Sequence, residues 1–165
     1  AEKLIERVQA LNAESRFLAY EPGEFCMTIH QECDYIRQRT ENAHAFFLIA
    51  ELGDEIVGSC DAVPVRDLQR FRHRAVLTLA VSKAFRRLGI GRLLLTKVLD
   101  WCRENGYEQA ELEVVANNAP AIALYESVGF TITGNYKNAF KYADGTYADE
   151  YFMWMPLQDG AQIRK

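Results

Sequence analysis

Apolar and polar residues alternate with two different periods along this chain, and the changes of period divide it into helices and strands. Apolar positions recur every three to four residues over 2–11 and 90–101, which predicts an amphipathic helix in each range. Apolar runs over 45–52, 74–81 and 110–115 predict strands, because they are short and rich in Val, Leu and Phe.

Cap and turn residues place the remaining elements. Thr28 can cap a second helix that reaches Arg39, with Ile29, Cys33 and Ile36 facing inward. The other expected elements are a hairpin partner strand at 55–65 after Gly53-Asp54, a short helix capped by Asn117 or Asn118 with Pro120 in its first turn, and strands at 130–142 and 147–157 joined across Asp144-Gly145.

This order of elements predicts one mixed α/β sheet in a single domain of residues 1–165. The chain opens inside a helix and without Met, so we expect an N-terminal strand to have been trimmed or to lie upstream. For the same reason we expect no signal peptide. Residues 158–165 are polar and are expected to form a loose tail.

Two connections leave alternatives open. The loop at 12–25 is rich in aromatic residues, so it either forms part of a functional site or is a packed connector. The connection at 64–73 is rich in arginine, so it is either a solvated loop or a lip beside bound phosphates.

Composition narrows the class of protein. Hydrophobic residues make up 49% and charged residues 25% of the chain, which is typical of globular proteins, and no apolar run reaches the ~20 residues of a membrane span. The net charge of −4 argues against nucleic acid as a partner. The four cysteines and three histidines show no metal-site spacing, so we expect no metal. The cysteines are expected to be buried or half-buried free thiols in a reducing cytoplasm.

The clearest candidate for a ligand site is the turn between the strand at 74–81 and the helix that starts near Gly89. Glycines at such a turn let backbone N–H groups approach a ligand, and the helix N-terminus adds unpaired donors and a positive dipole end. Arg86, Arg87 and Arg92 add positive charge on the same side. The turn is therefore predicted to hold a pyrophosphate.

Two common phosphate loops do not fit this turn. A mononucleotide P-loop needs Gly-Lys-Ser or Gly-Lys-Thr, but Gly91 is followed by Arg92-Leu93. A dinucleotide turn needs a glycine three residues before Gly91, where Leu88 stands. The pattern Arg86-x-x-Gly89-x-Gly91 instead resembles the acetyl-CoA pyrophosphate loop of the GNAT N-acetyltransferase superfamily.

A second motif strengthens this resemblance. The segment at 112–130, Leu-Glu-Val-x-Ala-Asn-Asn-x-x-Ala-Ile-x-Leu-Tyr-Glu-x-x-Gly-Phe, resembles the second GNAT signature at the expected distance downstream. The ending at 138–153 resembles a bacterial branch near the ribosomal-protein and amino-acid acetyltransferases. The resemblance implies the GNAT fold: a mixed, mostly antiparallel sheet flanked by about four helices, whose central strands splay apart.

The resemblance also implies a site for acetyl-CoA as co-substrate. Leu79 and Val81 would present backbone groups to the pantetheine arm, and Asn118 would bind near the thioester. The pyrophosphate would lie on the turn formed by Arg86, Arg87, Leu88, Gly89, Ile90, Gly91 and Arg92.

Two residues match catalytic positions of the family. Tyr125 corresponds to a tyrosine proposed to protonate the leaving thiolate, although it could instead be a core aromatic. Glu113 corresponds to a strand glutamate used as general base, although it could be a solvated carboxylate, with a water relay as base. Many relatives carry a glutamate on the preceding strand, where this chain has Val76. The absence of that second carboxylate favours Glu113, or a water relay, as the general base.

The resemblance predicts acetyl transfer to a primary amine, which would be a small amine, an amino acid or a peptide N-terminus. The alternative is an acyl-CoA-binding regulatory module whose acceptor site has degenerated. A proton donor and acceptor at Tyr125 and Glu113 favour the enzyme, since a binding module needs neither. The apolar strand at 151–155 could pair across a homodimer.

Overall fold

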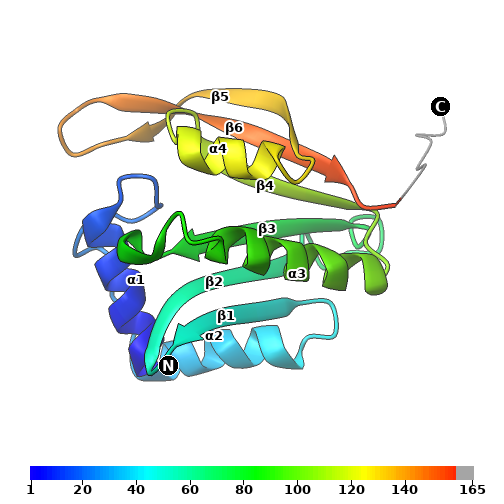
Figure 1. Cartoon of the computed structure of the whole chain (residues 1–165), viewed down its shortest axis with the longest axis horizontal. Helices are drawn as coiled ribbons and strands as arrows, with labels where there is room; N and C mark the ends of the chain where they lie inside the picture. The colour runs from blue at the N-terminus through cyan, green and yellow to red at the C-terminus, as the bar shows by residue number, and fades with distance from the viewer. Residues whose placement is uncertain (159–165) are drawn as a thin grey trace.

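One six-stranded sheet organises the computed structural model, which describes residues 1–158. Its strand order is β1-β2-β3-β4-β6-β5, and every neighbouring pair is antiparallel except β3 and β4 (Figure 1). The strands are β1 (Phe46–Leu52), β2 (Glu55–Pro64), β3 (Arg74–Val81), β4 (Gln109–Val115), β5 (Thr131–Lys141) and β6 (Tyr147–Pro156). The predicted mixed, mostly antiparallel sheet is confirmed, and the predicted loose tail lies almost wholly outside the described residues.

Four α-helices and one short 3₁₀ helix accompany the sheet in the described part of the chain. They are α1 (Glu2–Glu14), α2 (Ile29–Glu41), η1 (Lys83–Phe85), α3 (Ile90–Glu104) and α4 (Ala119–Glu126). Along β2, Gly58 faces α3, whereas Ser59 and Asp61 face α1 and α2 respectively. Because strand side chains alternate between faces, α3 covers one face of the sheet and α1 and α2 cover the other.

The main core lies between α3 and the sheet. Leu95, Val98 and Cys102 recur at helical spacing and are at most 1% exposed. Burying a Leu or Val side chain contributes about 1.5–3 kcal/mol, so this face holds α3 firmly against the strands. At its outer end Trp101 stacks on Phe46 with ring centroids 5.0 Å apart.

The central strands β3 and β4 separate part of the way along. Their pairing covers only Arg74–Val76 against Gln109–Glu111, although β3 continues to Val81 and β4 to Val115. We call the space beyond the last pair the strand gap. The predicted splaying of the central strands is therefore confirmed.

The second helix begins as predicted but buries a different face. Thr28 caps it with a full capping box, yet Ile29 is 54% exposed and Cys33 is also exposed. Glu32 is buried instead, and Arg39 lies 3.2 Å from the buried carboxylate of Asp61. Of the predicted inward residues, Ile36 is half-buried against the apolar cavity beside α1, whereas the prediction was wrong for Ile29 and Cys33. The helix directs Glu32 and Arg39, rather than a full apolar stripe, toward the rest of the protein.

Two other predictions fail on strand position. Strand β6 pairs with β4 on one side and β5 on the other, so 151–155 is not a sheet edge and cannot pair across a homodimer. The homodimer itself stays a prediction. The basic connection at 65–73 precedes β3, and the glycine turn follows this strand. The length of β3, about 23 Å at ~3.3 Å per residue, therefore separates the connection from the turn. The connection is therefore an exposed loop and not a lip beside the turn.

Candidate active site

The glycine turn that follows β3 has an uncommon backbone. After η1, Arg87 has φ +67° and Gly89 has φ +84° before α3 starts at Ile90. The left-handed region suits glycine but costs a residue such as arginine about 1–2 kcal/mol. Strain of this kind is concentrated at ligand sites, so the turn is shaped for more than a simple connection.

Six consecutive backbone N–H groups of this turn are available to a ligand. No backbone carbonyl of the described residues accepts from 87–92, and the first helical bond runs from the Leu93 N–H to the Gly89 carbonyl at 3.0 Å. The positive end of the α3 dipole lies at the same place. The structure thus brings together Arg87, Leu88, Gly89, Ile90, Gly91 and Arg92 in an arrangement that fits a pyrophosphate.

The three arginines of the turn differ in their engagement. Arg87 is exposed and forms no ion pair with the described residues, and Arg92 donates to Ser127 Oγ at 2.7 Å. Arg86 donates through Nε to the Val81 carbonyl at 3.0 Å and lies 3.8 Å from Glu14. Arg86 therefore ties the turn to the end of α1 as well as adding charge.

The strand gap presents backbone groups of both central strands beside the turn, of which the Val81 carbonyl already accepts from Arg86. The Ser82 N–H donates to the Val57 carbonyl at 3.0 Å, which orients the even-numbered residues of β3 toward β2. The backbone groups of Leu79 and Val81 consequently face the gap, beyond the last pair with β4. On the other side the Glu113 backbone faces the gap, because the even-numbered residues of β4 bond to β6.

Helix α4 contributes the predicted Tyr125 and Asn118. The Tyr125 ring is 7% exposed and meets Phe130 edge to face at 6.0 Å, so the ring is part of the core. Burial raises the pKa of Tyr125, with the Cys60 thiol adding to the effect, so the hydroxyl keeps its proton. Asn118 begins α4, but its side chain forms no capping bond and is free for a ligand.

Glu113 lies on the opposite face of the sheet from α4. Leu112 and Val114 point into the core on the α3 side, so Glu113 points to the other face together with Glu111, which forms an ion pair with Arg74. It is exposed, and its cross-strand partner is Phe152.

The sequence analysis missed Glu150, which lies on this face diagonally from Glu113. Burial raises the pKa of Glu150, and the Glu113 charge raises it further. A carboxylate with a raised pKa is a better proton acceptor for an ammonium group, so Glu150 joins Glu113 as a candidate base. The sequence shows that Glu150 and Phe152 lie on the same face of their strand. Only the order of the strands in the sheet shows that this face brings Glu150 beside Glu113.

A cavity of about 560 Å³ opens between the end of α1, the following loop and the β5–β6 hairpin. Arg16 lies 4.1 Å over the Tyr142 ring, and Glu21 accepts from the Ala143 N–H at 3.1 Å, so the loop is fastened to the hairpin. Asn12 Oδ1 and the Tyr142 hydroxyl are buried without a hydrogen-bond partner. Both residues line the cavity. Asn12 stands at the start of the segment at 12–25 that was expected to be a functional loop or a packed connector, whereas nothing in the sequence singled out Tyr142.

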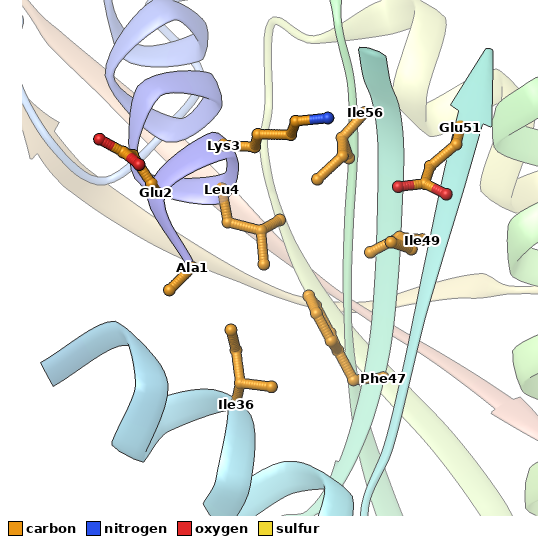
Figure 2. Close-up of a pocket in the computed structure, with 9 residues that line it drawn as sticks. All are labelled: Ala1, Glu2, Lys3, Leu4, Ile36, Phe47, Ile49, Glu51 and Ile56. Atoms are coloured by element: carbon orange, nitrogen blue, oxygen red, sulfur yellow. The ribbon is translucent and has the colours of Figure 1, made fainter. Parts of the chain in front are cut away.

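A second cavity, of about 510 Å³, lies between α1, α2 and the β1–β2 hairpin (Figure 2). Apolar side chains such as Leu4, Ile36 and Phe47 dominate it, with Lys3 and Glu51 at its margin. None of its lining residues belongs to the glycine turn, the strand gap or α4. It is therefore separate from the candidate active site.

The described residues contain no group of three His, Cys, Asp or Glu placed to bind a metal ion. Within the same residues no helix has both the length and the apolar character to cross a bilayer. Cys26, Cys33, Cys60 and Cys102 are all free. Cys60 and Cys102 are buried, whereas Cys26 and Cys33 are exposed, contrary to the expectation of buried or half-buried thiols.

Comparison with known proteins gives a consistent result. The profile of the Acetyltransferase (GNAT) family matches residues 6–130. A mouse protein named probable N-acetyltransferase family 8 member 5 is 38% identical over 96 residues, which are 58% of this chain and 42% of that protein. The [ribosomal protein bS18]-alanine N-acetyltransferase of Salmonella typhimurium is 39% identical over 82 residues, 50% of this chain and 55% of that protein. The chain spans about half the length of the curated relatives it matches.

Solved structures share the whole fold. A GNAT-family acetyltransferase from Streptococcus pneumoniae aligns with a TM-score of 0.89 at 22% identity, over 94% of this chain and 92% of that one. The ribosomal-protein-alanine N-acetyltransferase of Brucella melitensis aligns with a TM-score of 0.79 at 26% identity, over 94% and 96%.

Proposed function

Because the chain belongs to the GNAT acetyltransferase family, we propose that it transfers an acetyl group from acetyl-CoA to a primary amine. The observation that carries the proposal is the strand gap, which opens directly beside six unpaired N–H groups at the start of α3. This arrangement suits a ligand that has a pyrophosphate at one end and a narrow arm reaching between strands. Acetyl-CoA has both.

The two faces of the sheet separate the reactants in this proposal. The pyrophosphate lies on the α3 side, on the turn at 86–92, and the thioester lies in the gap beside Val81 and Asn118. The amine approaches from the face that carries Glu113 and Glu150, through the cavity next to α1. Holding the amine and the thioester in line accounts for much of the rate acceleration, because the two reactants then react within one complex and need not meet in solution.

Each proton has a proposed route. An ammonium acceptor must lose a proton before it attacks, and Glu150 or Glu113 takes it directly or through water. Attack places negative charge on the carbonyl oxygen, where the Val81 N–H can donate to it. The bond to sulfur then breaks, and Tyr125 gives its proton to the CoA thiolate. The attacking nitrogen loses its second proton to water, and a proton from that water restores the Tyr125 hydroxyl. A thiol has a pKa of about 8.5, so the thiolate is a fair leaving group and the acid assists only modestly.

The acceptor class remains a small amine, an amino acid or a peptide N-terminus. The name of the Salmonella relative, a ribosomal-protein alanine acetyltransferase, favours a peptide N-terminus. We also propose that residues 1–165 form one such domain, and that its four free thiols belong in a reducing cytoplasm.

The test is CoA release from acetyl-CoA in the presence of a panel of amines, amino acids and N-terminal peptides. Wild type should release CoA with at least one acceptor, and the Tyr125→Phe variant should release it more slowly. The alternative, a regulatory acyl-CoA-binding module, predicts acetyl-CoA binding with no acceptor-dependent release.

A further inference from the structure

Arg7, in the middle of α1, is a buried arginine without a carboxylate in contact. Its side chain is 7% exposed, and no Asp or Glu of the described residues lies within 4 Å of its guanidinium. Burial lowers its pKa, while the more distant Glu14 partly offsets this effect. Removing a guanidinium from water costs several kcal/mol, so its placement requires an explanation.

The guanidinium is directed at one peptide group of β3. Its Nη2 donates to the Ala80 carbonyl at 2.7 Å, and Nη1 donates to Ser59 Oγ at 3.0 Å. Its Nε is buried without a partner. The shortest contact of this cation is thus to a neutral backbone oxygen.

The Ala80 carbonyl and the Val81 N–H belong to the same planar peptide unit and point in opposite directions. The carbonyl points toward β2 and Arg7, so the N–H points into the strand gap. A charged donor on the oxygen withdraws electron density from the peptide. This makes the N–H on the other side a stronger donor.

We propose that Arg7 is a positioning residue that orients and polarises the Ala80–Val81 peptide, so that the Val81 N–H stabilises charge on the acetyl carbonyl oxygen. The inference rests on the proposed acetyl transfer. Arg7 touches neither reactant, and it acts through one peptide bond. It also explains why a cation without a counter-charge is buried beside this strand and not at the surface.

The experiment combines kinetics with vibrational spectroscopy on the full chain. Infrared difference spectra of bound acetyl-CoA, labelled with ¹³C at the acetyl carbonyl, report the polarisation of that bond directly. Arg7→Met should move the carbonyl stretch to higher frequency and lower kcat by about 10- to 100-fold. That loss is at or below the ~10²–10³ seen when an oxyanion donor itself is removed. The acetyl-CoA Kd should change less than threefold, and Arg7→Lys should recover part of both effects.

Arg39→Met is the matched control, because Arg39 is also an inward-facing arginine on a helix of the same face, but it pairs with Asp61. It should lower Tm without moving the carbonyl stretch. If Arg7→Met folds poorly, the neutral variant Arg7→Gln replaces it in the test. A wild-type carbonyl frequency in a folded neutral variant, Arg7→Met or Arg7→Gln, overturns the inference. If wild type itself binds no acetyl-CoA, the proposed function fails instead.

Discussion

Gly91 on α3 and Leu124 on α4 lie so close that a Cβ atom added to Gly91 would be 3.3 Å from Cδ2 of Leu124. Gly89 has no heavy atom within 4 Å of an added Cβ, but its φ is +84°. The two glycines therefore serve different purposes. Gly89 gives the turn its left-handed bend, and Gly91 lets the two helices meet beside the strand gap.

The first prediction separates these two roles. In wild type, acetyl-CoA at a hundredfold excess over Kd should add about 2.7 kcal/mol to the free energy of unfolding. Gly91→Val should abolish this gain, because a branched side chain forces α3 away from α4. Gly89→Ala should cost about 1–2 kcal/mol of stability and still show a gain, since the N–H groups remain. Thermal unfolding with and without acetyl-CoA measures both, and an undiminished gain in Gly91→Val contradicts the assignment.

Sequence patterns predicted the elements of this fold because each local signal agreed with its surroundings. The cap of α2 at Thr28 and the turn at Asp144-Gly145 are local features, and the sequence contains all that determines them. The prediction for the inward face of α2 failed at Ile29 and Cys33, because apolar periodicity cannot represent a buried ion pair such as Arg39 and Asp61.

The candidate site also contains residues that the sequence could predict and residues that it could not. The glycine turn is contiguous in sequence, so its donors could be predicted from the residues themselves. Glu150 and Tyr142 could not, because their roles depend on which strands become neighbours and where the β5–β6 hairpin ends. Arg7 carried no signal either, since an arginine in a helix is ordinarily solvated.

The second prediction concerns Tyr125. Replacement by Phe should lower kcat by at most about 10²-fold, near the bottom of the range for acid–base catalysis. The acetyl-CoA Kd should barely change, because the ring still fills the space beside Phe130. Steady-state kinetics with the true acceptor, together with a binding isotherm, measure the two quantities. Full kcat in Tyr125→Phe would show that the residue is only a core aromatic.

The third prediction is a pH dependence set by Glu150. A base must be deprotonated to act, and burial and the Glu113 charge both raise the Glu150 pKa. The rate should therefore fall as pH drops through a value above the ordinary ~4.3 of a glutamate. Glu150→Gln should remove this acidic limb and lower kcat.

Glu113→Gln gives the matched comparison for that pair. It removes the neighbouring charge, so the Glu150 pKa should fall and the acidic limb should move to lower pH, although burial still raises it. The pH–rate profiles of the two variants and wild type test the assignment. A limb that stays in place in Glu150→Gln and disappears in Glu113→Gln would assign the base to Glu113.

The last prediction concerns the loop that borders the cavity next to α1. The Glu21 carboxylate accepts from the Ala143 N–H at 3.1 Å and so ties the loop to the hairpin. Glu24 accepts from the Glu21 N–H at 2.9 Å, a bond within the loop that helps to place Glu21. Glu21→Ala removes the tie and one negative charge from the cavity wall. If the amine binds there, its KM should rise about tenfold, since a hydrogen bond of a charged group contributes about 1.5–3 kcal/mol and the loop relaxes only in part. The acetyl-CoA KM should stay unchanged, because the glycine turn lies on the other side of the strand gap. Glu55→Ala, an exposed glutamate at the β1–β2 hairpin, is the control and should alter neither constant. A rise confined to the acetyl-CoA KM, or no change in either constant, would exclude this loop from the acceptor site.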